Sequence, residues 1–184
     1  MEALNDVVRS GKVRYIGASS MATWQFQKMN NIAERNGWAK FVSMQNLYNL
    51  VYREEEREMM PYCKDAGIGI TPWSPLNAGT LAGKKRESTE RANSEFTPDR
   101  WQPSSLQKSN DLIMDRIGEL ATKHKATYSQ IAMAWHLAKP YVHSPIIGVS
   151  KMEQLYDLVG CLKIKLTEEE VKYLEEPYTP RAAM

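Results

Sequence analysis

The chain has 184 residues, of which 42% are hydrophobic and 25% are charged, and its formal net charge is +2. These values lie close to those of an average folded domain, which excludes a wholly disordered protein. The small net charge argues against a nucleic-acid or membrane-surface partner, and no apolar run approaches the roughly 20 residues of a membrane span.

Two cysteines, Cys63 and Cys161, lie far apart in the sequence and within helical patterns. Their separation does not match the spacing of metal ligands, and unpaired thiols suit a reducing compartment. The first residues, MEALNDVVRSGKVR, carry acidic side chains and lack the apolar core of a secretion signal. We therefore expect a cytoplasmic protein.

The hydrophobic pattern alternates between helices and short strands. Helices are expected over 2–10, 22–35, 53–65 and 110–125, from 127 to the residue before Pro140, after Ser150, and from 167 to the residue before Pro177. Strands are expected over 13–18, 41–45, 68–73 and 145–149. Each strand is a continuous apolar stretch, which is typical of parallel strands covered by helices. The alternation favours an α/β fold built from right-handed βαβ units.

Two helix starts and one long loop interrupt this pattern. Thr127 with Gln130, and Thr167 with Glu170, have the form of capping boxes. The segment from about 76 to 108 is rich in Gly, Ser, Asn, Lys and Pro and has little periodicity. Loops of this length are usually functional or disordered, so we expect a segment that covers a bound ligand, with disorder as the alternative.

Each predicted strand ends in small polar or aromatic residues. These residues are Ser19 and Ser20, Gln45 and Asn46, Trp73 and Ser74, and Gly148 and Ser150. The carboxyl ends of parallel strands meet at one rim, where (β/α)8 barrels bind their ligands. Four βα units are fewer than a complete barrel requires, so the pattern predicts part of such a barrel.

In that order, the segments GKVRYIGASS, QNLYNL, TPWSPLNAGTLAGK and IIGVSKMEQL resemble the second half of the aldo-keto reductase family. The likeness runs nearly the whole length of the chain and is greatest to fungal reductases of secondary-metabolite pathways. It implies one truncated domain over 1–184, a partial (β/α)8 TIM barrel with roughly the last four βα units and the C-terminal helix. It further implies an NADP-dependent oxidoreductase that reduces a ketone or aldehyde, with NADPH as cofactor and a small-molecule carbonyl compound as substrate.

The resemblance implies roles at the nicotinamide end of the cofactor. Ser19 and Gln45 would hydrogen-bond the carboxamide, and Ser20 would lie beside them. Trp73 would stack against the nicotinamide ring, because an aromatic face gives contact without competing polar chemistry.

It also implies roles at the phosphates and the adenine. The turn along the pyrophosphate would comprise Ser74, Pro75, Leu76, Asn77 and Ala78. Lys84 would add a positive charge there, Gly148 and Ser150 would bind the adenosine phosphate at a helix start, and Gln154 and Asp157 would face the adenine. Many relatives place Arg or Lys near Ser150 and Asn where Leu158 stands; Lys151 is the available substitute, and the preference between NADP and NAD stays open.

The catalytic residues of the family are a tyrosine supported by Lys, Asp and His, all from the first half of the barrel. No segment of this chain carries them, so we assign no catalytic residue and no metal ligand. Tyr48 follows Gln45 but is not expected to act as an acid. His124, His136 and His143 are expected at surface or packing positions.

Two functions follow from this reading. The chain is part of a reductase that is inactive without the missing half, or it is a catalytically inactive relic that serves as a cofactor-binding or interaction module. A parallel half-sheet also leaves apolar faces and two unpaired edges exposed. We therefore expect association, as a homodimer or an aggregate, through the exposed half-barrel face.

Overall fold

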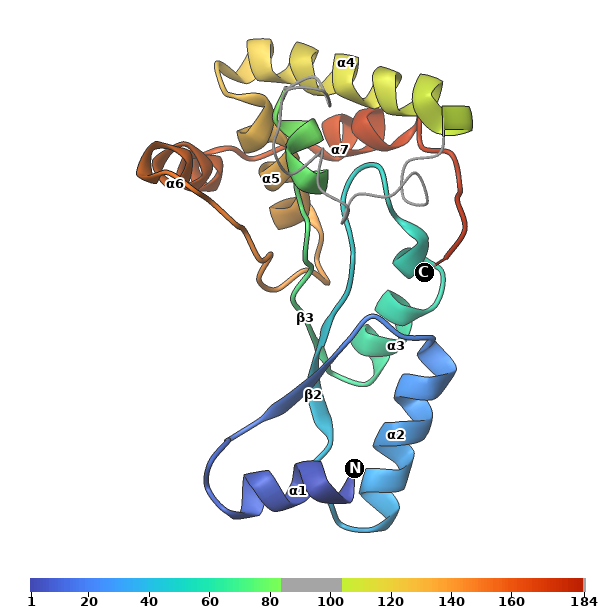
Figure 1. Cartoon of the computed structure of the whole chain (residues 1–184). Coiled ribbons are helices and arrows are strands. Elements are labelled where there is room, and N and C mark those ends of the chain that lie inside the picture. Colours follow the sequence, from blue (N-terminus) through green and yellow to red (C-terminus); the bar gives the residue numbers. More distant parts are fainter. Residues whose placement is uncertain (84–103, 184) are drawn as a thin grey trace.

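Helices alternate with parallel strands in the first part of the chain (Figure 1). The structure is a computed structural model, which describes residues 1–83 and 104–183. The elements in this part are α1 (Glu2–Arg9), β1 (Ile16–Ser19), α2 (Thr23–Arg35), β2 (Phe41–Gln45), the 3-10 helix η1 (Glu54–Glu56), α3 (Met59–Asp65) and β3 (Gly69–Ile70). The strands form a parallel sheet in the order β1-β2-β3, which confirms the predicted α/β class and parallel pairing.

The remaining elements are helical. They are η2 (Asn77–Ala82), η4 (Ser104–Leu106), α4 (Gln107–His124), α5 (Tyr128–Ala138), α6 (Met152–Val159), η5 (Gly160–Lys163) and α7 (Glu168–Glu175). Figure 1 shows α2 and α3 alongside the strands, whereas α4, α5 and α7 gather beyond the carboxyl ends of the strands. Most of the predicted loop over 76–108, including Lys84, lies outside the described residues.

Both predicted capping boxes are confirmed. In the first, the Gln130 amide N–H donates to Thr127 Oγ1 at 3.2 Å, and the Thr127 N–H donates to Gln130 Oε1 at 3.1 Å. In the second, the corresponding distances between Thr167 and Glu170 are 3.2 and 2.9 Å. Each box satisfies N–H groups that the first turn of a helix leaves without partners.

Proline explains two differences from the predicted elements. The helix expected over 53–65 is divided, and α3 begins only at Met59. Pro61 then falls in the first turn of α3, where its missing N–H costs nothing. In a longer helix an N–H at position 61 would have to bond the Arg57 carbonyl, and proline has no such group. The third strand is shorter than predicted and ends at Ile70, two residues before Pro72, which cannot donate to a neighbouring strand.

The fourth predicted strand, over 145–149, is wrong as an assigned element. Among the described residues this segment contributes only one isolated parallel bridge, between Ile146 and Trp73. Ile146 N–H donates to the Pro72 carbonyl at 2.7 Å, and Pro145 offers no N–H to extend the pairing. The segment nevertheless lies beyond β3, where the fourth strand was expected.

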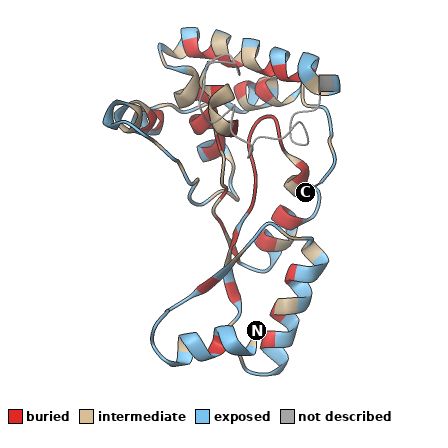
Figure 2. Ribbon diagram, viewed as in Figure 1, coloured by how far each residue is buried: buried red, intermediate tan, exposed pale blue. Residues whose placement is uncertain are grey.

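The core runs from the contact between the sheet and helices α2 and α3 to helices α4 and α5 beyond the strand ends (Figure 2). Phe26 of α2 stacks on Phe41 of β2 with ring centroids 5.7 Å apart, and it meets Tyr62 of α3 edge-on at 5.9 Å. The opposite face of β2 is less covered, and Val42 on that face is 45% exposed.

Cys63 and Cys161 are both buried and unpaired, as the sequence predicted. None of the helices over 1–83 and 104–183 combines the length and the apolar composition needed to cross a membrane.

Gly17 allows β1 and β2 to approach closely. A Cβ at this position would lie 2.3 Å from Ser43 Oγ and 3.2 Å from the Ser43 carbonyl oxygen, and the two residues are paired in the sheet. We expect Gly17→Ala to lower the free energy of unfolding by about 1–3 kcal/mol, because the neighbouring strand must shift. Urea denaturation followed by far-UV circular dichroism measures this loss.

Gly69 provides a matched control in β3. A Cβ there would meet only the Val42 carbonyl oxygen at 3.6 Å, which is ordinary contact. Gly69→Ala should therefore change the free energy of unfolding by no more than about 0.5 kcal/mol. Equal losses in the two variants would contradict the close approach at Gly17.

Candidate cofactor-binding rim

The carboxyl ends of the three strands are joined by hydrogen bonds. Ser19 Oγ donates to the Gln45 carbonyl oxygen at 2.8 Å, and the Ser20 N–H donates to the same oxygen at 3.1 Å. Trp73 Nε1 donates to Ser20 Oγ at 3.2 Å. Ser19, Ser20 and Gln45 are exposed, whereas Trp73 is half-buried. The fold thus brings four of the predicted site residues together on one surface.

The turn after Trp73 has an unusual backbone. Ser74, Asn77 and Ala78 all have positive φ angles, of 55°, 48° and 55°. Such angles are costly for residues with a side chain and persist only where surrounding contacts hold them. Asn49 Nδ2 donates to the Ser74 carbonyl at 3.0 Å, and the Ala78 N–H donates to Ser74 Oγ at 3.3 Å. Pro75 and Leu76 complete this turn, with Pro75 buried.

A buried histidine lies near the turn. His136 of α5 is fully buried, with its ring edge-on to Tyr48 at 5.4 Å. Burial lowers the pKa of His136 to about 3, although the Pro75 carbonyl raises this pKa in part. The imidazole is therefore neutral, and its packing role is as predicted. The other two histidines are also structural: His143 Nδ1 accepts the Ile70 N–H at 3.1 Å, and His124 lies 2.7 Å from Glu170.

Ser150 and Gln154 bond each other at the start of α6. Gln154 Oε1 accepts the Ser150 N–H at 2.9 Å and lies 3.3 Å from Ser150 Oγ. The helix itself begins at Met152, slightly later than the sequence suggested. Gly148 is exposed just before this contact. Their assignment to the adenosine phosphate stays a prediction.

Asp157 has partners that the sequence did not indicate. Its carboxylate accepts from Thr127 Oγ1 at 3.0 Å and from Gln130 Nε2 at 3.1 Å. Gln130 Nε2 also donates to the Asp157 carbonyl at 2.7 Å. Asp157 therefore ties α6 to the capping box of α5. Its predicted place beside the adenine, and that of Gln154, stay predictions.

Tyr48 follows β2 and lies in the core against α5, where its ring meets those of Trp135 and His136. Its side chain is fully buried, and its hydroxyl bonds the Glu56 carboxylate and lies 3.1 Å from the Tyr141 hydroxyl. Burial, and then the negative charge of Glu56, raise the pKa of Tyr48 far above its usual range. A tyrosine so enclosed does not present its proton to a ligand, which agrees with the expectation that it is not an acid.

A charged cluster behind Tyr48 was missed by sequence reasoning. Arg53 Nη2 lies 2.8 Å from Glu56 Oε2 and 2.9 Å from Glu175 Oε2. Trp135 Nε1 donates to Glu175 Oε1 at 2.8 Å. The three-residue spacing of Arg53 and Glu56 was a visible signal, but nothing local marked Glu175 as their partner.

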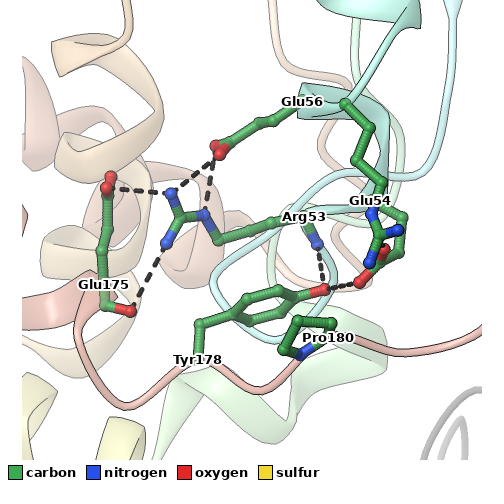
Figure 3. A pocket seen from close by; sticks show the side chains of 7 residues that line it. Arg53, Glu54, Glu56, Glu175, Tyr178 and Pro180 are labelled. Atoms are coloured by element: carbon green, nitrogen blue, oxygen red, sulfur yellow. Dashed lines mark hydrogen bonds and ion pairs between the residues drawn. The ribbon is translucent and has the colours of Figure 1, made fainter.

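This cluster borders a cavity of about 320 Å³ (Figure 3). The cavity is lined by Arg53, Glu54, Glu56, Arg57, Glu175, Tyr178 and Pro180. Tyr178 donates its hydroxyl proton to Glu54 at 2.5 Å and accepts the Arg53 N–H at 3.0 Å. The Arg181 N–H also donates to Glu54, at 2.7 Å. These bonds fasten the C-terminal segment to η1. Within the part of the chain that the structure describes, no group of His, Cys, Asp and Glu is arranged to hold a metal ion.

Comparisons with known proteins agree with this arrangement. The family model for the aldo/keto reductase family matches residues 1–178. Versiconal hemiacetal acetate reductase of Aspergillus parasiticus is 50% identical over 183 residues, covering 99% of this chain and 53% of that protein. An aldo-keto reductase of Fusarium vanettenii is 45% identical over 188 residues, covering 98% and 48%. The aldo-keto reductase dtxS3 of Metarhizium robertsii is 43% identical over 187 residues, covering 98% and 48%.

The chain spans about half the length of these relatives. The family match nevertheless extends almost from one end of the chain to the other. By this match and by the parallel α/β arrangement that precedes it, the chain belongs to the aldo/keto reductase family.

Proposed function

We propose that the described residues form the nicotinamide-binding side of an NADPH-dependent aldo-keto reductase, an oxidoreductase that reduces a ketone or aldehyde. The observation that carries this proposal is the contact among Ser19, Ser20, Gln45 and Trp73 at the carboxyl ends of parallel strands. Three parallel strands, with the 145–149 segment beyond them, support a partial (β/α)8 barrel as the underlying fold.

The donor set fits a carboxamide. Ser19 Oγ uses its proton on the Gln45 carbonyl, so its lone pairs stay available for an amide N–H. The exposed Gln45 side chain offers both a donor and an acceptor. The bond from Trp73 Nε1 to Ser20 fixes the indole plane, which would give an aromatic ring a defined surface. When bound, the cofactor supplies the hydride.

The other end of the cofactor would meet the segment from Gly148 to Gln154. The exposed Lys151 is the nearest cation in sequence to Ser150 and would pair with a 2′-phosphate. The strained turn at 74–78 would lie along the pyrophosphate. Its backbone is already held in one conformation.

Tyr48 bears on the catalytic step. Its hydroxyl is enclosed by Glu56 and Tyr141, so Tyr48 would not supply the proton for a carbonyl substrate. That proton would come from the family's catalytic tyrosine in the first half of the barrel, which no segment of this chain carries. The same observation favours a second candidate function, in which the chain binds NADPH without turning over a substrate.

The relative named versiconal hemiacetal acetate reductase supports a small-molecule carbonyl compound as the substrate class. Two buried, unpaired thiols support the cytoplasm as the compartment.

Titration of the purified chain with NADPH tests the cofactor site. We expect quenching of tryptophan fluorescence that is lost in Trp73→Phe and retained in Trp24→Phe, because Trp24 is 62% exposed on α2. Ser19→Ala and Gln45→Ala should each raise the dissociation constant about threefold to tenfold, the worth of one hydrogen bond. Absence of binding at millimolar NADPH would remove the proposal.

Two further measurements separate the alternatives. A parallel titration with NADH shows whether the 2′-phosphate contributes to binding. NADPH consumption with a panel of aldehydes and ketones distinguishes a reductase from a cofactor-binding module.

A further inference from the structure

The segment that follows β2 is a buried loop. Every residue over 46–52 is buried. Loops usually run over the surface of a protein, because a buried loop must find partners for its polar backbone groups. Asn49 and Tyr52 meet this need in part by exchanging two backbone hydrogen bonds, each at 3.0 Å. A loop enclosed in this way is a fixed support for the chain that lies against it.

The main chain of Trp73 lies against this buried loop. The Trp73 N–H donates to the Asn46 carbonyl oxygen at 2.9 Å, and Trp73 forms a parallel bridge with Leu47. On its other side Trp73 forms a second parallel bridge, with Ile146. The backbone of Trp73 is therefore held between two segments, and the chain turns at the next residue, Ser74.

The Asn49 side chain joins the buried loop to this turn. Its Nδ2 donates to the Ser74 carbonyl oxygen at 3.0 Å, and its Oδ1 accepts the Val51 N–H at 3.0 Å. The side chain is fully buried. The two contacts need a donor and an acceptor on one short side chain. Asparagine supplies both, whereas aspartate supplies acceptors only and leucine supplies neither.

The turn that Asn49 supports has a costly backbone. Ser74 has a φ of 55°, a conformation that residues with a side chain rarely adopt. The Ser74 carbonyl also accepts the Asn77 N–H at 3.0 Å, but that bond lies within the turn itself. The bond from Asn49 instead anchors the turn to the buried loop. Because Ser74 follows Trp73 directly, a change of conformation at Ser74 would shift the Trp73 main chain and, with it, the indole.

We infer that Asn49 is a positioning residue for the nicotinamide end of the cofactor site: it holds the turn at Ser74 and thereby fixes the place of the Trp73 indole. Ser20, which accepts the indole Nε1 proton at 3.2 Å, then fixes the plane of the ring. Asn49 is itself buried, so it acts on the cofactor only through Trp73 and Ser74. The effect on the cofactor rests on the proposed function, whereas the effect on the indole does not.

Near-UV circular dichroism, without cofactor, tests the place of the indole. A tryptophan held in one environment contributes a band in this region, and the band of Trp73 is obtained by comparing each variant with and without Trp73→Phe. We expect Asn49→Ala and Asn49→Asp to remove most of this band. Asn49→Asp keeps the size of the side chain and the acceptor for Val51, so it removes the donor alone. An unchanged band in both variants would overturn the inference.

Asn30 provides a matched control at the opposite end of β2. It is a buried asparagine of α2, and its Oδ1 accepts the N–H of Phe41, the first residue of β2, at 2.9 Å. Asn30→Ala therefore also removes a buried bond from side chain to backbone, and it should lower stability in urea about as much as Asn49→Ala. It should leave the Trp73 band unchanged. Loss of the band in Asn30→Ala as well would indicate a general loosening of the fold and would refute the specific role of Asn49.

Titrations with two ligands test the effect on the cofactor. Asn49→Ala should raise the dissociation constant of NADPH about threefold to tenfold, the worth of one hydrogen bond. It should leave unchanged that of adenosine 2′,5′-bisphosphate, which lacks the nicotinamide. Equal weakening of both ligands, or unchanged NADPH binding in both Asn49 variants, would contradict the positioning role. If the unmodified chain binds no NADPH, the proposed function fails, and the Trp73 band still decides whether Asn49 positions the indole.

Discussion

Replacing Trp135 with alanine is expected to lower the free energy of unfolding by about 3–5 kcal/mol, which is the cost of removing a large buried aromatic ring. Trp135 is fully buried, and its ring lies 5.0 Å from that of Tyr48 and 5.0 Å from that of His136. Its Nε1 also donates to Glu175, so the substitution leaves a half-buried carboxylate with one partner fewer. Urea denaturation followed by far-UV circular dichroism measures the loss.

Two further variants separate the contributions of packing and hydrogen bonding. Trp135→Phe keeps most of the apolar ring but not the N–H, so it should cost about 1–3 kcal/mol. Trp24→Ala removes a tryptophan that is 62% exposed and should change stability by no more than about 0.5 kcal/mol. Equal losses at Trp135 and Trp24 would contradict the position of Trp135 at the centre of the core.

Arg53→Met is expected to lower the free energy of unfolding by about 3 kcal/mol, the lower end of the cost for buried ion pairs, because removing one member of this partly buried cluster leaves charge uncompensated. The Arg53 side chain is 13% exposed, and those of its partners Glu56 and Glu175 are 25% and 18% exposed. Methionine keeps much of the side-chain volume, so the loss reports charge more than packing. Lys40→Met breaks an exposed pair with Glu34 and should cost no more than about 1 kcal/mol.

The same variant changes how stability depends on pH. Burial alone raises the pKa of Glu56, but hydrogen bonds from Arg53 and Tyr48 and the charge of Arg53 outweigh it, so the pKa is lowered. A lowered pKa contributes stability that is present above the ordinary value, about 4.5, and is lost as the pH falls through the folded-state value. Without Arg53, only the Tyr48 hydrogen bond and the charge of Lys139 still oppose the effect of burial on the pKa of Glu56, so this contribution becomes smaller.

Denaturation at pH 7 and pH 4 measures the effect. The difference in stability between the unmodified chain and Arg53→Met should be smaller at pH 4, because protonation of Glu56 removes part of what Arg53 provides. A constant difference across this range would show that Glu56 does not depend on Arg53.

Local sequence patterns predicted much of the fold. The capping boxes at Thr127 and Thr167 were recognisable because their partners lie only three residues away. Strand β2 was predicted at its observed bounds, since Phe41 to Gln45 is a compact apolar run ending in a polar residue. The fourth strand failed because apolar residues alone do not form a strand: Pro145 cannot donate, and pairing stops after a single bridge.

Part of the candidate site could also be predicted from the sequence, and part could not. The sequence predicted that Ser19, Gln45 and Trp73 lie at one rim, because residues at the ends of parallel strands meet there. It did not predict that Trp73 bonds Ser20, or that Asp157 bonds Thr127 and Gln130. Those contacts depend on the angle at which one helix or strand approaches another, which no local pattern records.

The sequence by itself determined the α/β class and the parallel pairing of the strands, because both follow from local periodicity. It also carried the resemblance to the aldo/keto reductase family, through short motifs at the ends of the strands, and the family match confirms this resemblance. Only the tertiary structure decided that Tyr48 is enclosed with Glu56 and Tyr141, and that Arg53 joins η1 to α7. The physical reason is that these contacts join segments far apart in the chain: Tyr48 and Tyr141 are separated by 93 positions, and Arg53 and Glu175 by 122. Only folding brings such segments together.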